Sequence, residues 1–232
     1  MTLTVVPTIS TAAPFASPHG SFGTILVDPP WQFTNRTGKV APEHRRLHRY
    51  ETLTLDAIKG LPVEQLAAPT AHLYLWCPNA LLPDGLAVMA AWGFTYKSNI
   101  VWHKVRKDGG SDGRGVGFYF RNVTELILFG VRGKNARTFA PGRRQVNLLA
   151  TREREHSRKP DEQYEIIEAC SPGPFLELFA RNTREGWTAC GDEIVVSARA
   201  EEAAAKDYPI DPPPPPDYEE LPRDPDHDGA AP

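Results

Sequence analysis

Short apolar runs alternate with helical segments along most of this chain, and this alternation constrains its fold more than any other feature. Runs rich in β-branched and aromatic residues predict strands, and the periodic segments between them predict helices. Strands that alternate with helices are typical of an α/β layered sheet. The predicted strands cover residues 24–27, 72–77, 96–105, 124–133, 175–181 and 187–193, and a further short strand is predicted within residues 3–9. The predicted helices cover residues 54–66, 81–94 and 159–173. Thr54 is the predicted N-cap of the first helix, and Pro160 is predicted in the first turn of the last.

The stretch I-L-V-D-P-P-W at residues 25–31 marks an abrupt end to the first of these strands. Pro29 favours extended geometry at Asp28, and neither Pro29 nor Pro30 has an N–H to donate to a sheet ladder. The strand should therefore end at Asp28 and leave a carboxylate, two proline carbonyls and the Trp31 indole beside one another. Such a group of acceptors suits a planar substrate that carries an NH₂ group. The alternative is an ordinary strand end with an N-capping aspartate and a core tryptophan.

The length of 232 residues and the hydrophobic content of 41% are sufficient for a single domain with a sizeable core. We place this domain at residues 1–199. Residues 201–232 hold ten acidic and two basic side chains, together with a run of five prolines. We therefore expect residues 200–232 to be an acidic, Pro-rich disordered tail. The net charge of −3 thus divides into −8 in the tail and +5 in residues 1–200.

Cysteine spacing and hydropathy argue against several classes of protein. Cys77, Cys170 and Cys190 are scattered without C-x-x-C spacing, which predicts buried thiols in a reducing cytosol rather than disulfides or a zinc site. His44 and His48 lie four residues apart, but no third ligand accompanies them, so we expect no metal. No apolar run approaches the length of a membrane span. We therefore expect a cytoplasmic protein that does not associate with a membrane.

Positive charge collects in three predicted loop regions, residues 36–49, 104–121 and 132–159. Aromatic residues lie within the last two, and loop arginines beside aromatic rings suit phosphate contact and base stacking. A solvated charged surface is the alternative. The glycine-rich residues 106–117 lack a G-K-[ST] ending and precede no predicted helix, so they do not form a P-loop. These features favour a nucleic-acid partner.

Five short motifs follow one another in a defined order. They are D-P-P-W at 28–31, Y-x-T-L-T-L-D at 50–56, H-L-Y-L-W at 72–76, K-P-D-E at 159–162 and E-L-F-A-R at 177–181. In this order they resemble the DPPW-type N6-adenine methyltransferases. That family includes the catalytic subunit of the eukaryotic mRNA N6-adenosine methyltransferase, with bacterial and phage relatives. The resemblance spans roughly residues 20–195. It implies a permuted Rossmann-like methyltransferase domain that uses S-adenosylmethionine.

By this resemblance, Asp28, Pro29, Pro30 and Trp31 form the catalytic motif. Asp28 and the Pro29 carbonyl receive the adenine amino hydrogens, Trp31 helps to form the base pocket, and Asp28 also contacts the cofactor. An adenine amine is a poor nucleophile because its lone pair is delocalised into the ring. Acceptors that draw on its hydrogens favour a more tetrahedral nitrogen aimed at the sulfonium methyl group. A target base within a duplex would have to be flipped out of the stack.

The resemblance also implies where the methionine end of the cofactor binds. Lys159 matches the family lysine that pairs with the cofactor carboxylate, and Arg181 matches a cofactor-contacting arginine. A further contact to this carboxylate falls on Asn182 or Thr183, because the turn after Arg181 is shorter than the family pattern.

Contacts to the nucleoside end of the cofactor follow less directly. The family's G-N-Q motif binds the ribose hydroxyls, but this chain has Gly191, Asp192 and Glu193 at that place. The carboxylates of Asp192 and Glu193 can accept hydrogen bonds from hydroxyls but cannot donate as amides do. Spacing relative to Asp28 predicts that the cofactor's adenine ring lies near Ile9 and Ser10.

The sequence therefore predicts an S-adenosylmethionine-dependent methyltransferase that modifies the N6 amine of adenine in DNA or RNA. Two alternatives stay open, a cytosine N4 methyltransferase and a catalytically silent nucleic-acid-binding partner of a methyltransferase. Trp31 favours adenine, and the intact D-P-P-W motif argues against a silent partner. The sequence does not distinguish DNA from RNA, and assembly into a homodimer or heterodimer stays open.

Overall fold

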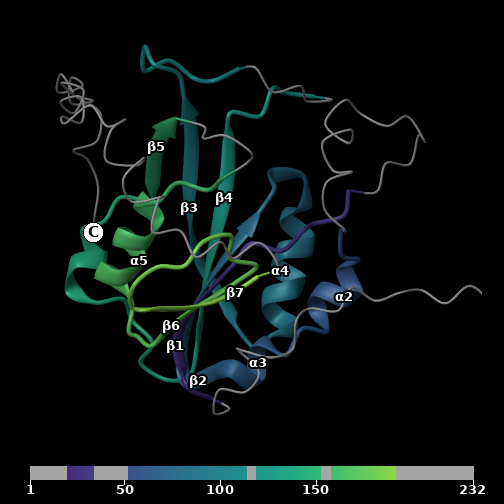
Figure 1. Cartoon of the computed structure of the whole chain (residues 1–232), viewed down its shortest axis with the longest axis vertical. Coiled ribbons are helices and arrows are strands. Elements are labelled where there is room, and N and C mark those ends of the chain that lie inside the picture. Colours follow the sequence, from purple (N-terminus) through teal and green to yellow (C-terminus); the bar gives the residue numbers. More distant parts are fainter. Residues whose placement is uncertain (1–19, 34–51, 114–118, 153–157, 192–232) are drawn as a thin grey trace, which may run out of the picture. The chain divides into compact units, whose positions relative to one another are not determined.

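The structure is a computed structural model that describes residues 20–33, 52–113, 119–152 and 158–191 (Figure 1). Several sequence-based predictions lie outside these ranges. They are the strand within residues 3–9, the Ile9 and Ser10 contacts, the His44 and His48 pair, and the Asp192 and Glu193 contacts. The domain boundary at residue 199 and the acidic tail also lie outside and stay predictions.

One sheet of seven strands forms the centre of the described residues, in the order β5-β3-β4-β2-β1-β6-β7. Its strands are β1 (Phe22–Val27), β2 (Ala67–Cys77), β3 (Thr95–Val105), β4 (Thr124–Arg132), β5 (Leu148–Arg152), β6 (Phe175–Leu178) and β7 (Trp187–Cys190). Each pair of neighbours is parallel except β2 with β4 and β3 with β4. The parallel strands therefore end at one edge, where the antiparallel β4 begins. We call this the carboxyl edge.

Strand β1 lies in the interior of the sheet and positions the motif that follows it. Val27 pairs with Leu75 of β2 on one side and with Leu178 of β6 on the other. Every residue of β1 is buried, because helices cover both faces of the sheet. This burial explains why the strand reads as a continuous apolar run rather than an alternating one.

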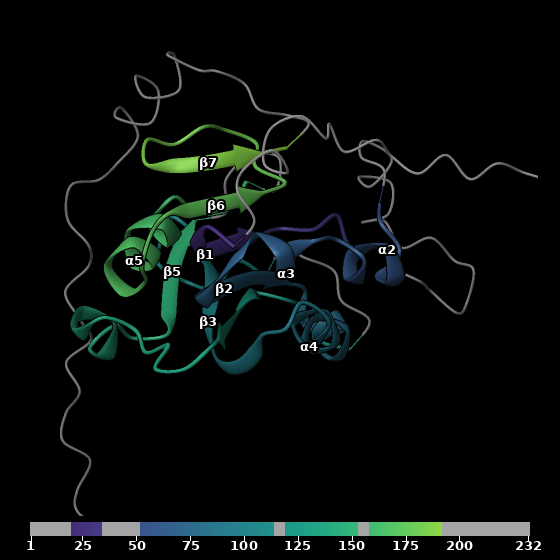
Figure 2. The same cartoon turned by 90° about the horizontal axis from the view of Figure 1, so that it is seen from below.

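Helices cover the two faces of the sheet (Figure 2). One face is covered by α2 (Leu55–Lys59), α3 (Val63–Leu66) and α4 (Leu82–Ala91). Their residues Ile58, Leu66 and Met89 form a core with Phe22, Ile25 and Val27 of β1. On the other face, α5 (Glu162–Cys170) packs Ile167 against a second core that contains Leu26. Two short 3₁₀ helices, η1 (Asn79–Leu81) and η2 (Ala140–Arg143), lie in connections. The predicted Rossmann-like α/β architecture is confirmed.

The structure corrects the sequence prediction at three elements. The helix predicted for residues 54–66 is two helices, because Gly60 ends α2 and Pro62 precedes α3. The predicted N-cap is confirmed, since the Thr54 hydroxyl accepts a hydrogen bond from the Ala57 N–H at 3.2 Å. Pro160 lies before α5 rather than in its first turn, since Asp161 is the N-cap. The sequence reading missed β5, which is an outer strand with too few buried side chains to show a clear pattern.

The three cysteines are buried thiols, as the sequence predicts. Cys77 ends β2, Cys170 ends α5 and Cys190 ends β7. Among the described helices, none has both the length and the apolar character that a membrane span requires.

Candidate active site

Asp28 is the first residue beyond β1 and lies at the carboxyl edge. Its backbone N–H is 3.5 Å from the Leu178 carbonyl at the end of β6, so the main chain continues the β1–β6 pairing by one residue. Its side chain is 27% exposed. Ligands of open α/β sheets bind at the carboxyl ends of the strands. The Asp28 carboxylate is therefore held by regular structure and still accessible to a ligand.

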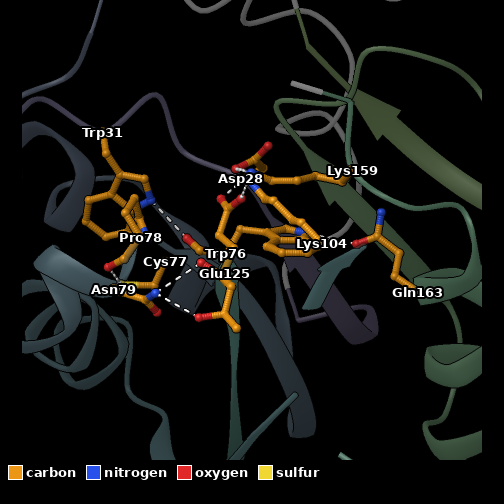
Figure 3. Close-up of polar contacts among 11 residues, drawn as sticks. Asp28, Trp31, Trp76, Cys77, Pro78, Asn79, Lys104, Glu125, Lys159 and Gln163 are labelled. Atoms are coloured by element: carbon orange, nitrogen blue, oxygen red, sulfur yellow. Dashed lines mark hydrogen bonds and ion pairs between the residues drawn. The ribbon is translucent and has the colours of Figure 1, made fainter. Parts of the chain in front are cut away.

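Three charged side chains gather around this carboxylate (Figure 3), and we call Asp28, Lys104, Glu125 and Lys159 the charged cluster. The Lys159 ammonium lies 2.6 Å from Glu125 Oε1 and 3.3 Å from Asp28 Oδ1. The Lys104 ammonium lies 3.4 Å from Glu125 Oε2. Two carboxylates and two ammonium groups thus balance one another in a partly buried position. Lys159, which precedes α5, joins the end of β1 to the start of β4.

Burial and neighbouring charges shift the pKa values of this cluster in different directions. Burial raises the pKa of Asp28, and the nearby Glu125 carboxylate adds to this, although Lys159 opposes it. Burial also disfavours the Glu125 carboxylate, but Lys159 and Lys104 outweigh burial and lower its pKa. Burial disfavours the Lys159 ammonium, yet Asp28 and Glu125 outweigh it and raise its pKa. Glu125 and Lys159 therefore both stay charged and form an ion pair. Of the two carboxylates in the cluster, Asp28 binds a proton more readily than Glu125.

Two tryptophans lie beneath the lysines. The Lys159 ammonium is 4.6 Å from the Trp76 ring centroid, and the Lys104 ammonium is 4.7 Å from the Trp102 ring centroid. The two indoles meet edge to face at 5.8 Å. The Trp76 indole N–H donates to the Gln163 side chain of α5 at 2.8 Å. These contacts restrict both lysine side chains, since a cation over an aromatic face gains roughly 0.5–2 kcal/mol.

The D-P-P-W backbone is held by bonds that the sequence does not reveal. Trp31 N–H donates to the Pro29 carbonyl at 2.8 Å, and Leu53 N–H donates to the Pro30 carbonyl at 2.9 Å. The Trp31 indole N–H donates to the Trp76 carbonyl at 2.9 Å. The Trp31 side chain is 7% exposed and belongs to the core on the α2–α4 face. In this structure Trp31 anchors the motif; its contact with a substrate base stays a prediction.

The structure brings Arg181 and Asn182 to the same edge as Asp28, directly after the end of β6. The positive charge of Arg181 is one of the groups that oppose the rise in the pKa of Asp28. The chain ends β6 with Phe179 at a φ of 63°, and Ala180 N–H donates to the Cys190 carbonyl of β7 at 3.0 Å. The predicted contacts of Lys159, Arg181 and Asn182 with a cofactor stay predictions, because Lys159 here contacts Asp28 and Glu125.

A close approach between β6 and β7 lies behind this turn. A side chain at Gly191 would collide with the backbone of Ala180, so only glycine fits there. Packing against Ala180 thus explains why a glycine, Gly191, stands at the first position of the segment that corresponds to the family's G-N-Q motif. This close contact holds the start of the predicted ribose-binding segment against the residue that precedes Arg181.

Sequence reasoning missed Glu125 and Lys104. Both lie in predicted strands, where a charged residue is usually solvent-facing, and only the antiparallel direction of β4 brings Glu125 to the carboxyl edge. Asn79 was also missed; its side-chain amide donates to the Thr124 backbone carbonyl at 3.0 Å and so ties β2 to the start of β4. A charge within the otherwise apolar run T-E-L-I-L-F was the available hint.

Three features together define a Rossmann-like methyltransferase domain. They are the mostly parallel sheet, the D-P-P-W segment at the end of an inner strand and the charged cluster beside that segment. In the described part of the chain, no group of three or more His, Cys, Asp or Glu side chains is placed to bind a metal ion. The chain belongs to the MT-A70 family, whose model matches residues 22–193.

Curated relatives are similar over most of this chain. A Medicago truncatula protein named putative N(6)-adenosine-methyltransferase MT-A70-like is 30% identical over 179 residues, which are 75% of this chain and 27% of that protein. The Homo sapiens N(6)-adenosine-methyltransferase catalytic subunit METTL3 is also 30% identical, over 75% of this chain and 28% of its own. The type II methyltransferase M.MunI of a Mycoplasma species is 28% identical over 76% of this chain and 79% of its own. The chain thus spans about a quarter of the length of the plant and human relatives but most of the bacterial one.

Proposed function

We propose that this protein transfers the methyl group of S-adenosylmethionine to the N6 amine of adenine in DNA or RNA. The observation that carries the proposal is the position of Asp28. Its carboxylate is accessible, lies at the carboxyl end of the inner strand β1 and is held on one oxygen by Lys159. Membership of the MT-A70 family and the names of the relatives support the same reaction.

Asp28 would accept a hydrogen bond from the adenine amine. We assign this role to Oδ2, because the Lys159 ammonium lies on Oδ1. Holding an N–H in this direction orients the nitrogen lone pair away from Asp28, which aligns the amine for in-line attack. A pre-positioned group of this kind typically contributes about 10²–10³ to the rate.

The methylated nitrogen carries one proton too many, and a base must receive it. Asp28 suits this step because its pKa is raised, so a proton is held more readily there than on an ordinary aspartate. Glu125, whose pKa is lowered, is the poorer acceptor. We therefore assign Glu125 and Lys159 to holding Asp28 in place rather than to the proton transfer.

The residues at the carboxyl edge fit S-adenosylmethionine, which supplies its methyl group from a positively charged sulfonium when bound. Asp28 offers a negative charge, while Lys159 and Arg181 offer positive charge for the carboxylate of the methionine part. Binding of the carboxylate by Lys159 would share the ammonium between this ligand and Glu125. An ammonium has three donors, so both contacts can be made at once.

The test is methyl transfer by the purified protein to adenine-containing DNA and RNA, single-stranded and duplex, followed by nucleoside mass spectrometry. N6-methyladenine in any substrate supports the proposal. N4-methylcytosine would mean that the acceptor is wrong. Absence of both products, with oligonucleotide binding retained, would mean that the protein is a silent partner.

A further inference from the structure

The connection between β3 and β4 exposes two adjacent aromatic side chains. Tyr119 is 94% exposed and Phe120 is 85% exposed, whereas the other large exposed hydrophobic side chains of the described residues are 37–66% exposed. Rings of this size each remove about 150–250 Å² from water when they are buried. Neither ring contributes to the fold, so a role in packing does not account for them.

The connection lies at the top of Figure 1. It leaves β3 just after Lys104 and enters β4 just before Glu125, both members of the charged cluster. The Lys104 backbone N–H donates to the Val123 carbonyl at 2.8 Å, and the Lys104 ammonium pairs with Glu125. Phe120 precedes Glu125 by five residues, so an extended chain places their Cα atoms at most about 17 Å apart. A strand advances about 3.4 Å per nucleotide, so Phe120 lies within about five nucleotide steps of Glu125 in the charged cluster.

The charge around the two rings is positive. Within the described residues of the connection, 106–113 and 119–123, three side chains are basic and two are acidic. Arg121 follows Phe120 directly and donates to the Gly113 carbonyl at 3.1 Å, which holds the two sides of the connection together. Arg106 is paired with Asp108 at 2.9 Å. Basic side chains beside exposed aromatic rings suit a nucleic acid better than an apolar protein surface.

We propose that Tyr119 and Phe120 form a stacking platform for the nucleobases that flank the target adenine. The inference rests on the proposed function, because it takes the target base to lie at Asp28. Extruding an adenine toward Asp28 leaves its neighbours without a stacking partner on one face. Two exposed rings at the end of a basic connection can cover those faces, and stacking of this kind is tolerant of sequence.

The test compares Tyr119→Ala, Phe120→Ala and the double variant with Tyr96→Ala. Tyr96 is also exposed, at 39%, but it lies near the start of β3 and hence at the opposite edge of the sheet. The probe is an oligonucleotide with 2-aminopurine next to the target adenine, in single-stranded and duplex form. Fluorescence anisotropy reports affinity, and quenching of 2-aminopurine reports stacking. Calorimetric titration with S-adenosylmethionine and thermal unfolding report whether the fold is intact.

We expect each alanine variant at Tyr119 or Phe120 to bind the oligonucleotide at least about fivefold more weakly and to lose 2-aminopurine quenching, with cofactor affinity and melting temperature unchanged. Phe120→Trp should keep the affinity, and Tyr96→Ala should behave as the unaltered protein. Unchanged affinity and quenching in the double variant would overturn the platform.

A protein partner is the competing occupant, and the same variants separate it. Sedimentation compares the oligomeric state of the double variant with that of the unaltered protein. If the unaltered protein is an oligomer, the double variant is a monomer and oligonucleotide binding is unchanged, the surface is a protein interface and the platform is wrong. Failure of the unaltered protein to methylate adenine would overturn the proposed function alone. Failure of the unaltered protein to bind any oligonucleotide would overturn the platform as well.

Discussion

Replacing Asp28 by asparagine should lower the rate of methyl transfer at least about a hundredfold without weakening the fold. The Lys159 ammonium attracts the Asp28 carboxylate at 3.3 Å, a gross interaction of ~5 kcal/mol at an effective dielectric constant of ~20. The raised pKa of Asp28 shows that burial and the Glu125 carboxylate outweigh this attraction. The charge of Asp28 is therefore a net cost to the folded state at neutral pH. Asparagine keeps the shape and removes that cost.

The sign of the pH dependence follows from the same shift. The folded-state pKa of Asp28 lies above its ordinary value of 3.8. The favourable contribution of this group to the free energy of unfolding is therefore present below pH 3.8 and is lost as the pH rises through the folded-state pKa. At pH 7 the Asp28→Asn variant should unfold at the same temperature as the unaltered protein or at a higher one. This difference should shrink as the pH falls and vanish below 3.8, where both side chains are neutral.

The activity of the same variant should fall by about 10²–10³, or ~3–4 kcal/mol of transition-state stabilisation. Methyl incorporation into an adenine-containing oligonucleotide and thermal unfolding at several pH values check both parts. Activity above about a hundredth of the unaltered level would refute the assignment of Asp28. A clearly lower melting temperature at pH 7 would refute the electrostatic reasoning, since it would show that the carboxylate stabilises the fold.

Three further predictions concern the supporting structure. Lys159→Ala should weaken S-adenosylmethionine binding by ~1.5–3 kcal/mol in calorimetric titration, the range for a hydrogen bond to a charged group; an unchanged dissociation constant would remove Lys159 from the cofactor site. Burial raises the pKa of Glu177 to about 7. The favourable contribution of this group to the free energy of unfolding is therefore lost as the pH rises through about 7. Glu177→Gln should raise the melting temperature at about pH 8.5 but not at about pH 5. An equal effect at both pH values would contradict this. Gly191→Ala should destabilise the fold by ~1–3 kcal/mol in denaturant unfolding, because the added Cβ would collide with the Ala180 backbone. Gly113→Ala is the control and should be nearly neutral, because a Cβ there meets no atom within 4 Å.

The sequence alone determined the fold class and the place of the D-P-P-W motif at a strand end. The two prolines after Asp28 cannot join a sheet ladder, so the end of β1 at this aspartate follows from local chemistry. The same holds for the Thr54 cap of α2, which the structure confirms. Five ordered motifs sufficed to indicate the family, because each one is short and contiguous.

The tertiary structure alone decided which side chains surround Asp28. Glu125 joins the charged cluster because β4 runs antiparallel to β2. Strand direction is set here by pairing between residues 49 to 61 positions apart in the sequence. Lys159 was predicted beside a cofactor carboxylate, but its contacts with Asp28 and Glu125 depend on how α5 packs against the sheet. The burial of Trp31 likewise depends on the β2 backbone that accepts its indole N–H. A local pattern specifies where a strand ends; long-range pairing and packing specify which charges meet there.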